Sequence, residues 1–218
     1  MTRDGAWRRR RLADARLYLC VDRRVEQGDL ADLLDAALAA GVDIVQLRDK
    51  EAGAGELRAA AAVFRDAADR YDALFVLNDD PSLATEVHAD GVHVGQSDVA
   101  PTKARMVVGA ERLVGRSTHT TEQIDHALAE DCDYFSVGPV HPTPTKEGRP
   151  PIGLDPLRHA AAVAGDRPWF VTGGMATDTA PEVLATGARR LVVVRAITDA
   201  KDPAAAATDL AGLLQIEH

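Results

Sequence analysis

Amide and cationic side chains follow one of the short apolar runs in this chain. In the stretch VQLRDK, Gln46, Arg48 and Lys50 are spaced by two residues. Along an extended backbone this spacing places all three side chains on one face. Two cations on the face of a buried strand need an anionic partner, because burying an unpaired cation is costly. We therefore expect an anion site; the alternative is a strand end in water, with Arg48 paired to Asp49 or Glu51.

Carboxylates follow the next two apolar runs. Asp79 stands in the stretch NDDP and Asp98 in DGVHVGQSD. Carboxylate oxygens without His or Cys partners suit Mg²⁺, which retains several waters and takes further ligands from phosphate. The alternative is helix capping, since Asx residues before proline are common N-caps and Asp98 alone is compatible with a cap. We predict one Mg²⁺ site formed by Asp79 and Asp98.

The longest polar stretch covers residues 138–153, GPVHPTPTKEGRPPIG. Thr143, Thr145 and Lys146 supply two hydroxyls and an ammonium, and the neighbouring prolines restrict the backbone. Long loops in compact domains are usually functional. We interpret this one as a lid that closes on phosphate; a plain surface loop is the alternative. The later stretch TGGM contains Gly173 and Gly174, which permit close approach of a ligand to the backbone.

The stretch GRSTHT contributes Ser117 and His119. The Ser117 hydroxyl is suited to donate to a ligand, although a single serine is weak evidence. We interpret His119 and His93 as structural rather than catalytic.

Eight short, largely β-branched runs separate stretches of helical periodicity, which is typical of parallel strands buried on both faces. The runs cover residues 17–21, 42–47, 73–77, 91–94, 112–115, 133–137, 169–172 and 191–194. Apolar stripes at helical spacing occupy residues 30–38, 124–128 and 210–214. Eight strand–helix units predict an α/β fold, a single (β/α)₈ TIM barrel. A doubly wound open sheet is the alternative, but its GxGxxG signature is absent.

Composition limits the classes of partner. The 218-residue chain has 34 acidic and 25 basic residues, a net charge of −9 at pH 7. A field of this sign gives no general affinity for nucleic acid or acidic membranes, so we expect neither as a partner. No apolar run approaches the ~18 residues of a membrane span. We expect a cytoplasmic protein whose partners are small molecules, compatible with a homo-oligomer.

Cys20 and Cys132 lie far apart in apolar segments without a CxxC spacing. We predict two buried thiols in a reducing compartment. Residues 1–16 contain the run Arg8 to Arg11, and we interpret them as a basic, solvated and loosely ordered tail. Residues 17–218 form the predicted barrel, since no Pro-, Gly- or Ser-rich linker divides them.

Six motifs occur in the order and spacing of thiamine-phosphate synthases: VQLRDK, NDD, DGVHVGQSD, GRSTHT, HPTPTK and TGG. The chain resembles that family from Leu17 to about Thr198. The resemblance implies a barrel that joins 4-amino-2-methyl-5-hydroxymethylpyrimidine diphosphate to 4-methyl-5-hydroxyethylthiazole phosphate, forms thiamine phosphate and releases pyrophosphate.

The resemblance also implies roles for individual residues. Asp79 and Asp98 match the ligands of one Mg²⁺ ion. Positions that match the pyrimidine-diphosphate site are Gln46, Leu47, Arg48, Asp49, Lys50, Asn78, Ser117 and Lys146. Positions that match the thiazole-phosphate site are Thr143, Pro144, Thr145, Gly174, Val194 and Arg195.

Two features depart from the family pattern: the usual GIGG reads VTGG, and Arg195 stands where serine is common. A guanidinium there would replace a hydroxyl contact to phosphate.

Charge neutralisation supports the implied reaction, because pyrophosphate leaves readily only when its growing charge is stabilised. We assign that role to Arg48, Lys50, Lys146 and Mg²⁺, and expect dissociative departure before capture by the thiazole nitrogen. The alternatives are a thiazole-phosphate tautomerase with a histidine base, a Schiff-base aldolase using Lys50 or Lys146, and a non-catalytic sensor of thiamine intermediates. Whether the thiazole is carboxylated stays open.

Overall fold

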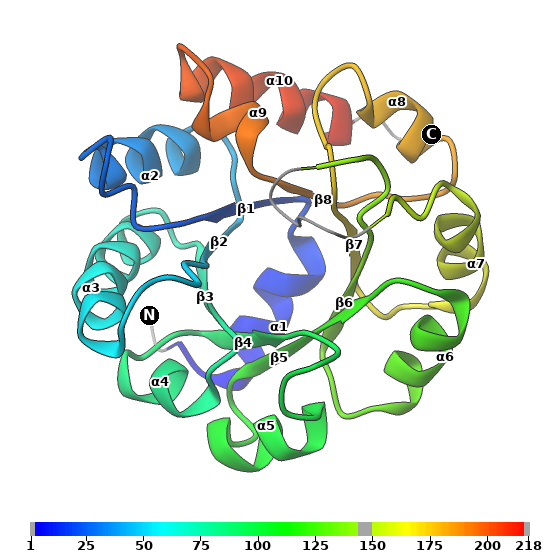
Figure 1. Cartoon of the computed structure of the whole chain (residues 1–218), viewed down its shortest axis with the longest axis horizontal. Coiled ribbons are helices and arrows are strands. Elements are labelled where there is room, and N and C mark those ends of the chain that lie inside the picture. Colours follow the sequence, from blue (N-terminus) through cyan, green and yellow to red (C-terminus); the bar gives the residue numbers. More distant parts are fainter. Residues whose placement is uncertain (1–2, 144–149, 216–218) are drawn as a thin grey trace.

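Eight parallel strands close into a barrel in chain order, with β8 paired to β1 (Figure 1). The computed structural model describes residues 3–143 and 150–215. Its strands are β1 (Leu17–Val21), β2 (Ile44–Leu47), β3 (Leu74–Asn78), β4 (Gly91–Val94), β5 (Leu113–Thr118), β6 (Tyr134–Val137), β7 (Trp169–Val171) and β8 (Leu191–Val193). Closure confirms the (β/α)₈ prediction and excludes the open sheet.

The helices that follow the strands form a ring around the barrel (Figure 1). The predicted apolar stripes fall in α2, α6 and α10, whose buried leucines and isoleucine face the sheet. The helices are α1 (Gly5–Asp14), α2 (Leu30–Ala39), α3 (Ala54–Arg70), α4 (Pro81–Glu86), α5 (Pro101–Val108), α6 (Thr121–Ala129), α7 (Asp155–Val163), α8 (Ala180–Leu184), α9 (Arg195–Thr198) and α10 (Pro203–Gln215).

Side chains alternate between two apolar layers along each strand. In β2, Val45 and Leu47 pack in the outer layer between sheet and helices, whereas Ile44 packs in the barrel interior against Tyr18 and Tyr134. The same alternation directs Gln46 inward, one step above Ile44. The inner layer thus fills the lower barrel and leaves the carboxyl ends of the strands for polar groups.

Residues 5–14 form helix α1 across the barrel interior (Figure 1), so the expectation of a loosely ordered tail was wrong for this segment. Trp7 and Leu12 are 4% and 2% exposed and pack against the inner layer. The helix is capped by Asp4, whose side chain accepts from the amide of Trp7 at 2.7 Å. The apolar contacts of Trp7 and Leu12 therefore help to fix the position of α1.

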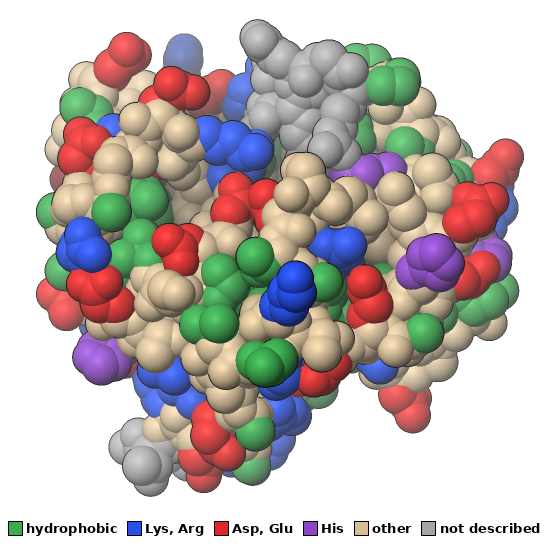
Figure 2. Space-filling model, turned by 60° about the horizontal axis from the view of Figure 1, so that its bottom comes forward, with side chains coloured by type: hydrophobic (Ala, Val, Ile, Leu, Met, Phe, Trp, Pro, Cys, Tyr) green, Lys and Arg blue, Asp and Glu red, His purple; other side chains and the backbone are tan. Residues whose placement is uncertain are grey.

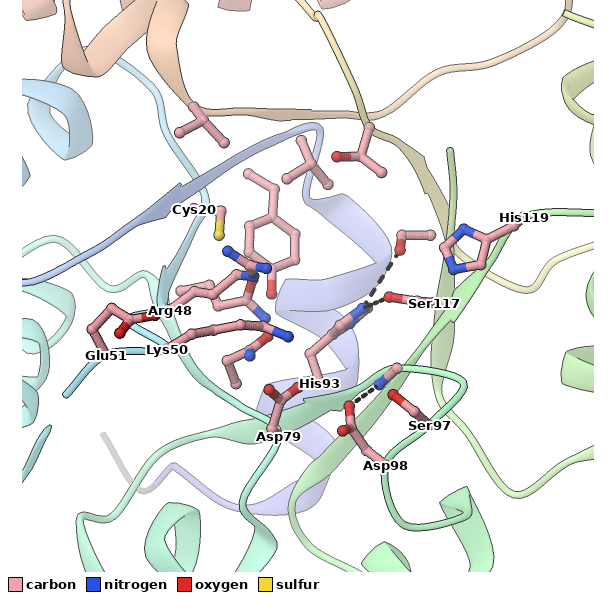
Figure 3. Close-up of a pocket in the computed structure, with 18 residues that line it drawn as sticks. Cys20, Arg48, Lys50, Glu51, Asp79, His93, Ser97, Asp98, Ser117 and His119 are labelled. Atoms are coloured by element: carbon pink, nitrogen blue, oxygen red, sulfur yellow. Dashed lines mark hydrogen bonds between the residues drawn. The ribbon is translucent and has the colours of Figure 1, made fainter. Parts of the chain in front are cut away.

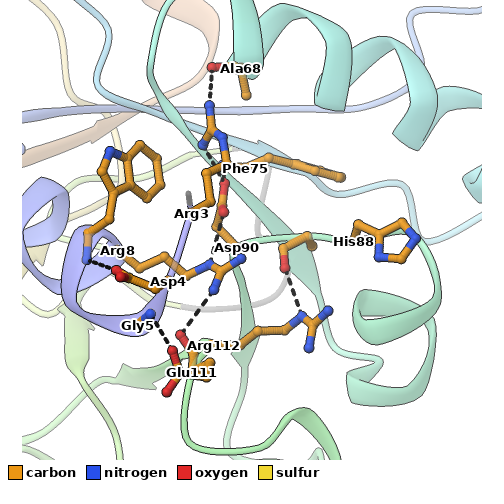
Figure 4. Close-up of polar contacts among 12 residues, drawn as sticks. Arg3, Asp4, Gly5, Arg8, Ala68, Phe75, His88, Asp90, Glu111 and Arg112 are labelled. Atoms are coloured by element: carbon orange, nitrogen blue, oxygen red, sulfur yellow. Dashed lines mark hydrogen bonds and ion pairs between the residues drawn. The ribbon is translucent and has the colours of Figure 1, made fainter. Parts of the chain in front are cut away.

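A buried carboxylate fixes the arginines around this end of the barrel (Figure 4). Asp90 is fully buried and forms ion pairs with Arg3 at 3.2 Å, Arg8 at 3.0 Å and Arg65 at 2.8 Å. It also accepts from the amide of Phe75 at 3.0 Å. This shared acceptor ties the N-terminal segment to α3 and β3.

Cys20 and Cys132 are both buried and form no disulfide with each other, as predicted. Among the described residues, no helix has the length and apolar character needed to cross a membrane.

Candidate active site

A cavity of about 460 Å³ opens at the carboxyl ends of the strands (Figure 3). Every strand, or the loop directly after it, contributes lining residues. In Figure 2, acidic and basic side chains meet in a hollow near the top of the view. The lining brings together most of the polar residues that the sequence places after strands, as expected for the active-site end of such a barrel.

The end of β2 supplies an amide and two cations to this cavity. Gln46, Arg48 and Lys50 all line it, as their spacing predicted. Gln46 is 5% exposed, and its Nε2 has no hydrogen-bond partner in the described part of the chain. Leu47 packs in the outer core and Asp49 is held by Arg23, so neither lines the cavity.

Arg48 and Lys50 form no ion pair with residues of 3–143 or 150–215. Asp49 does not neutralise Arg48, because its Oδ2 accepts from Arg23 Nε at 2.7 Å. Glu51 lines the same cavity but forms no salt bridge with either cation within the described chain. The charge of Asp79 acts on both cations, but neither forms a direct ion pair in the described chain, and two such cations in a recess favour an anionic ligand.

The two aspartates of the NDDP motif have different structural roles. Asp80 caps α4, because its Oδ1 accepts from the amide of Leu83 at 3.0 Å. Asp79 instead lines the cavity with a left-handed backbone (φ 66°), and its amide donates to the carbonyl of His93 at 2.8 Å. The capping alternative thus applies to Asp80 and leaves the Asp79 carboxylate available.

Asp98 lines the same cavity from the loop after β4. Its Oδ2 accepts from the amide of Gly95 at 2.7 Å. Asp98 does not cap α5, which begins at Pro101 with Ala100 in the N-cap position.

The two carboxylates are electrostatically coupled. Burial and the adjoining Asp98 raise the pKa of Asp79 to about 6, although the positive charges of Lys50 and Arg48 partly oppose this shift. A divalent cation between two like charges would keep both ionised, so this oxygen donor set fits Mg²⁺. The described residues contain no group of three His, Cys, Asp or Glu suited to a metal. Water or a substrate phosphate would supply the remaining ligands.

A buried polar network forms part of the cavity wall, where Tyr18, His93 and Ser117 are lining residues. His93 Nδ1 is 3.2 Å from the hydroxyl of Tyr134, and its Nε2 is 2.9 Å from Ser117 Oγ. The hydroxyls of Tyr134 and Tyr18 are 3.2 Å apart. Burial raises the pKa of Tyr134 well above its usual range. The network orients the Ser117 hydroxyl at the cavity wall, which agrees with a structural interpretation of His93.

A second cavity of about 280 Å³ adjoins the first and shares Thr172, Val192 and Val194 with it. Its lining also includes Thr143, Gly173, Gly174 and Arg195. Both glycines have left-handed backbones, and a Cβ on Gly174 would lie 2.7 Å from that of His141. Glycine is therefore required where the chain turns past this cavity.

Three predicted site residues, Pro144, Thr145 and Lys146, lie outside the described residues. Asn78, Ser117 and His119 line the first cavity. Sequence reasoning did not identify several further lining residues, because each is an ordinary strand or loop residue; for those within strands, the period of two was the available signal. They are Tyr18, Cys20, Gly95, Ser97, Ser136, Thr172 and Val192.

Comparisons with known proteins identify the family of the chain. The family model described as "Thiamine monophosphate synthase" matches residues 17–197. The thiamine-phosphate synthase of Mycolicibacterium vanbaalenii is 54% identical over 215 residues, covering 94% of this chain and 96% of that protein. The Streptomyces avermitilis protein of the same name is 53% identical over 208 residues, covering 95% and 97%.

Among solved structures, thiamine phosphate pyrophosphorylase from Pyrococcus furiosus superposes with a TM-score of 0.83 at 30% identity, covering 95% of this chain and 97% of that one. A 3-hexulose-6-phosphate synthase (TM-score 0.65, 21% identity, 91% and 99% coverage) shares the fold alone. With the family model spanning most of the chain and relatives above 50% identity, the chain belongs to the thiamine monophosphate synthase family.

Proposed function

We propose that this chain is a Mg²⁺-dependent thiamine-phosphate synthase. It condenses 4-amino-2-methyl-5-hydroxymethylpyrimidine diphosphate with 4-methyl-5-hydroxyethylthiazole phosphate and releases pyrophosphate. One observation carries the proposal: Arg48 and Lys50, which form no direct ion pair in the described chain, line the same cavity as Asp79 and Asp98. That combination suits a diphosphate accompanied by a divalent cation.

The cationic side of the cavity binds the leaving group. Arg48 and Lys50 stabilise the diphosphate oxygens as negative charge accumulates on them, and Lys146 adds a third cation from the polar loop. Asp79 and Asp98 would hold Mg²⁺, which when bound neutralises part of the charge on the departing pyrophosphate. Fixed charges in a recess act more strongly than the same charges in water.

The amide and hydroxyl groups of the cavity orient the pyrimidine. Gln46 Nε2 has no partner within the described residues and is buried, so a ring nitrogen would satisfy it. Asn78 and Ser117 line the same wall. The methylene C–O bond breaks with its electron pair on pyrophosphate, and the thiazole nitrogen then supplies the pair for the new C–N bond. No protein nucleophile is needed.

The second cavity takes the thiazole phosphate. The two cavities share Thr172, Val192 and Val194 in their linings, so the two substrates would bind side by side. Backbone amides around Gly174 and the guanidinium of Arg195 serve the phosphate, and Thr143 lines the same cavity.

The decisive experiment mixes both phosphorylated heterocycles with the full chain, with and without Mg²⁺, and measures pyrophosphate and thiamine phosphate. Equal amounts of both products, formed only with Mg²⁺ and both substrates, are expected. Turnover of the thiazole phosphate alone would indicate a tautomerase, and a borohydride-trapped adduct an aldolase. Binding of both ligands without pyrophosphate release would indicate a sensor.

A further inference from the structure

Arg116 is a buried cation that does not line the cavity. It lies in β5, opposite Val94 of β4, and is 8% exposed. Its neighbour Ser117 lines the cavity, so the alternation along the strand directs Arg116 to the other side of the sheet. A guanidinium in this position needs acceptors, because burying it without them is costly.

Those acceptors belong to the loop that carries Asp98. Arg116 donates to the carbonyl of Gly95 at 2.6 Å and to Oε1 of Gln96 at 3.4 Å. Its Nε lies 3.4 Å from Glu130 Oε2, which balances the charge. Hydrogen bonds from a charged donor are about twice as strong as neutral ones.

Further hydrogen bonds hold the loop after β4, through both Gln96 and Gly95. Gln96 Nε2 donates to the carbonyl of Ser117 at 2.5 Å, so the same amide bridges Arg116 and the strand that bears it. Gly95 is bonded twice to Asp98: its amide donates to Oδ2 at 2.7 Å, and its carbonyl accepts from the Asp98 amide at 3.2 Å. The Gly95 carbonyl therefore joins Arg116 directly to the Asp98 backbone.

We propose that Arg116 is a positioning residue for metal binding, acting through Gly95 and Gln96 to hold the Asp98 carboxylate beside that of Asp79. The inference rests on the proposed function, since it concerns the Mg²⁺ site. Two carboxylates at one rim repel each other before a cation arrives, and the short loop would otherwise relax away from Asp79. Arg116 opposes that relaxation from behind the sheet.

Three substitutions test the positioning role in the full chain. Arg116→Met keeps the apolar stem and removes every donor. Gln96→Ala removes the bridge from a half-buried loop residue and decides the question if Arg116→Met does not fold. Arg190→Met is the matched control, because Arg190 also donates to carbonyls, of Ala15 at 3.0 Å and Ala13 at 2.9 Å, but these lie at the C-terminal end of α1.

The readouts are Mn²⁺ binding, followed by electron paramagnetic resonance without substrates, and the Mg²⁺ concentration for half-maximal pyrophosphate release. Arg116→Met and Gln96→Ala are both expected to bind Mn²⁺ about 10- to 100-fold more weakly, the usual range for residues that support a metal ligand. Saturating Mg²⁺ should restore most of kcat. The control should lose stability without a change in metal affinity.

Unchanged Mn²⁺ affinity in both variants, with normal binding by the wild type, would overturn the role of Arg116 and leave the proposed function intact. Absence of Mn²⁺ binding by the wild type, together with Mg²⁺-independent pyrophosphate release, would overturn the metal site and the positioning role together.

Discussion

Arg23 holds Asp49 outside the cavity: its Nε lies 2.7 Å from Asp49 Oδ2. Burial disfavours ionisation of Asp49, yet the hydrogen bonds from Arg23 and from the amide of Glu51 outweigh it and lower the pKa of this carboxyl. Asp49 is thus a satisfied carboxylate between two cations, Arg48 and Lys50, that it does not neutralise. The positive potential of the cavity depends on this arrangement.

Replacing Arg23 by methionine should therefore weaken binding of the diphosphate substrate. The released Asp49 carboxylate would turn toward Arg48 or Lys50 and compete with the substrate. KM for the pyrimidine diphosphate is expected to rise several-fold, with little change in KM for the thiazole phosphate. Arg58→Met is the matched control, because Arg58 forms a comparable pair with Glu86 at 2.6 Å on the surface. Equal effects of the two substitutions on KM would contradict the explanation.

The neighbouring aspartates of NDDP offer a matched pair for the metal site. Asp79→Asn should weaken Mg²⁺ binding by about 10- to 150-fold, the equivalent of ~1.5–3 kcal/mol for one charge-assisted contact. Asp80→Asn should leave it unchanged, since asparagine caps helices as well as aspartate does. Isothermal titration with Mg²⁺ measures both. Removal of Mg²⁺ by EDTA should abolish pyrophosphate release by the wild type, and full activity after chelation would contradict the metal assignment.

Tyr134→Phe tests the buried network. The hydroxyl serves both His93 and Tyr18, so its loss leaves two buried polar groups with one partner fewer. The free energy of unfolding in urea should fall by ~1–3 kcal/mol. Tyr71→Phe, at a half-buried position after α3, should change it by much less. Similar urea midpoints for wild type and Tyr134→Phe would show that the network contributes little to stability.

Asp90→Asn tests how the N-terminal helix is anchored. The substitution leaves three arginines around an uncharged side chain and should cost ~3–5 kcal/mol, the usual effect of breaking a buried ion pair. Asp69→Asn is the control, because Asp69 contacts Arg3 and Arg65 from an exposed position and should contribute under about 1 kcal/mol. Chemical unfolding and proteolysis near residues 5–14 report both effects. A small loss for Asp90→Asn would mean that Trp7 and Leu12 alone anchor α1.

Cys132 predicts a pH dependence at the alkaline side. Burial raises the pKa of its thiol to about 11, against the slight opposing effect of Arg167. The unfolded chain ionises this group near pH 8.5. The contribution of this thiol to the free energy of unfolding is therefore fully present below pH 8.5 and is lost as the pH rises toward 11. Compared with Cys132→Ala, the wild type should lose on the order of 3 kcal/mol over that interval. Parallel stability curves for the two proteins would contradict the shift.

The barrel could be predicted from sequence because its strands are uninterrupted apolar runs, and β1 and β4 have the predicted bounds. β5 extends three residues beyond the prediction. Arg116, Ser117 and Thr118 end the apolar run, but the ladder continues with Ser117 opposite Ser136 and Thr118 opposite Val137. Because the last residues of this strand carry polar side chains, a hydrophobicity pattern predicts that the strand ends too early.

Long-range contacts explain what the sequence did not reveal. Trp7 and Leu12 are too few to mark α1 as amphipathic, and only the barrel interior shows what they cover. In NDDP, the choice between Asp79 and Asp80 as cap depends on the left-handed backbone at Asp79, which residue types alone do not determine. The sequence did not indicate a role for Arg116, because its acceptors are backbone and side-chain atoms of the loop after β4.

Helix α1 closes one end of the barrel. Trp7 and Leu12 pack against residues at the starts of several strands, so in the described part of the chain we expect substrates and products to pass at the carboxyl ends of the strands. In the proposed reaction, the ligand bound deeper in the cavity can leave only after the ligand nearer the opening. The order of release therefore depends on the depth of each ligand as well as on its affinity.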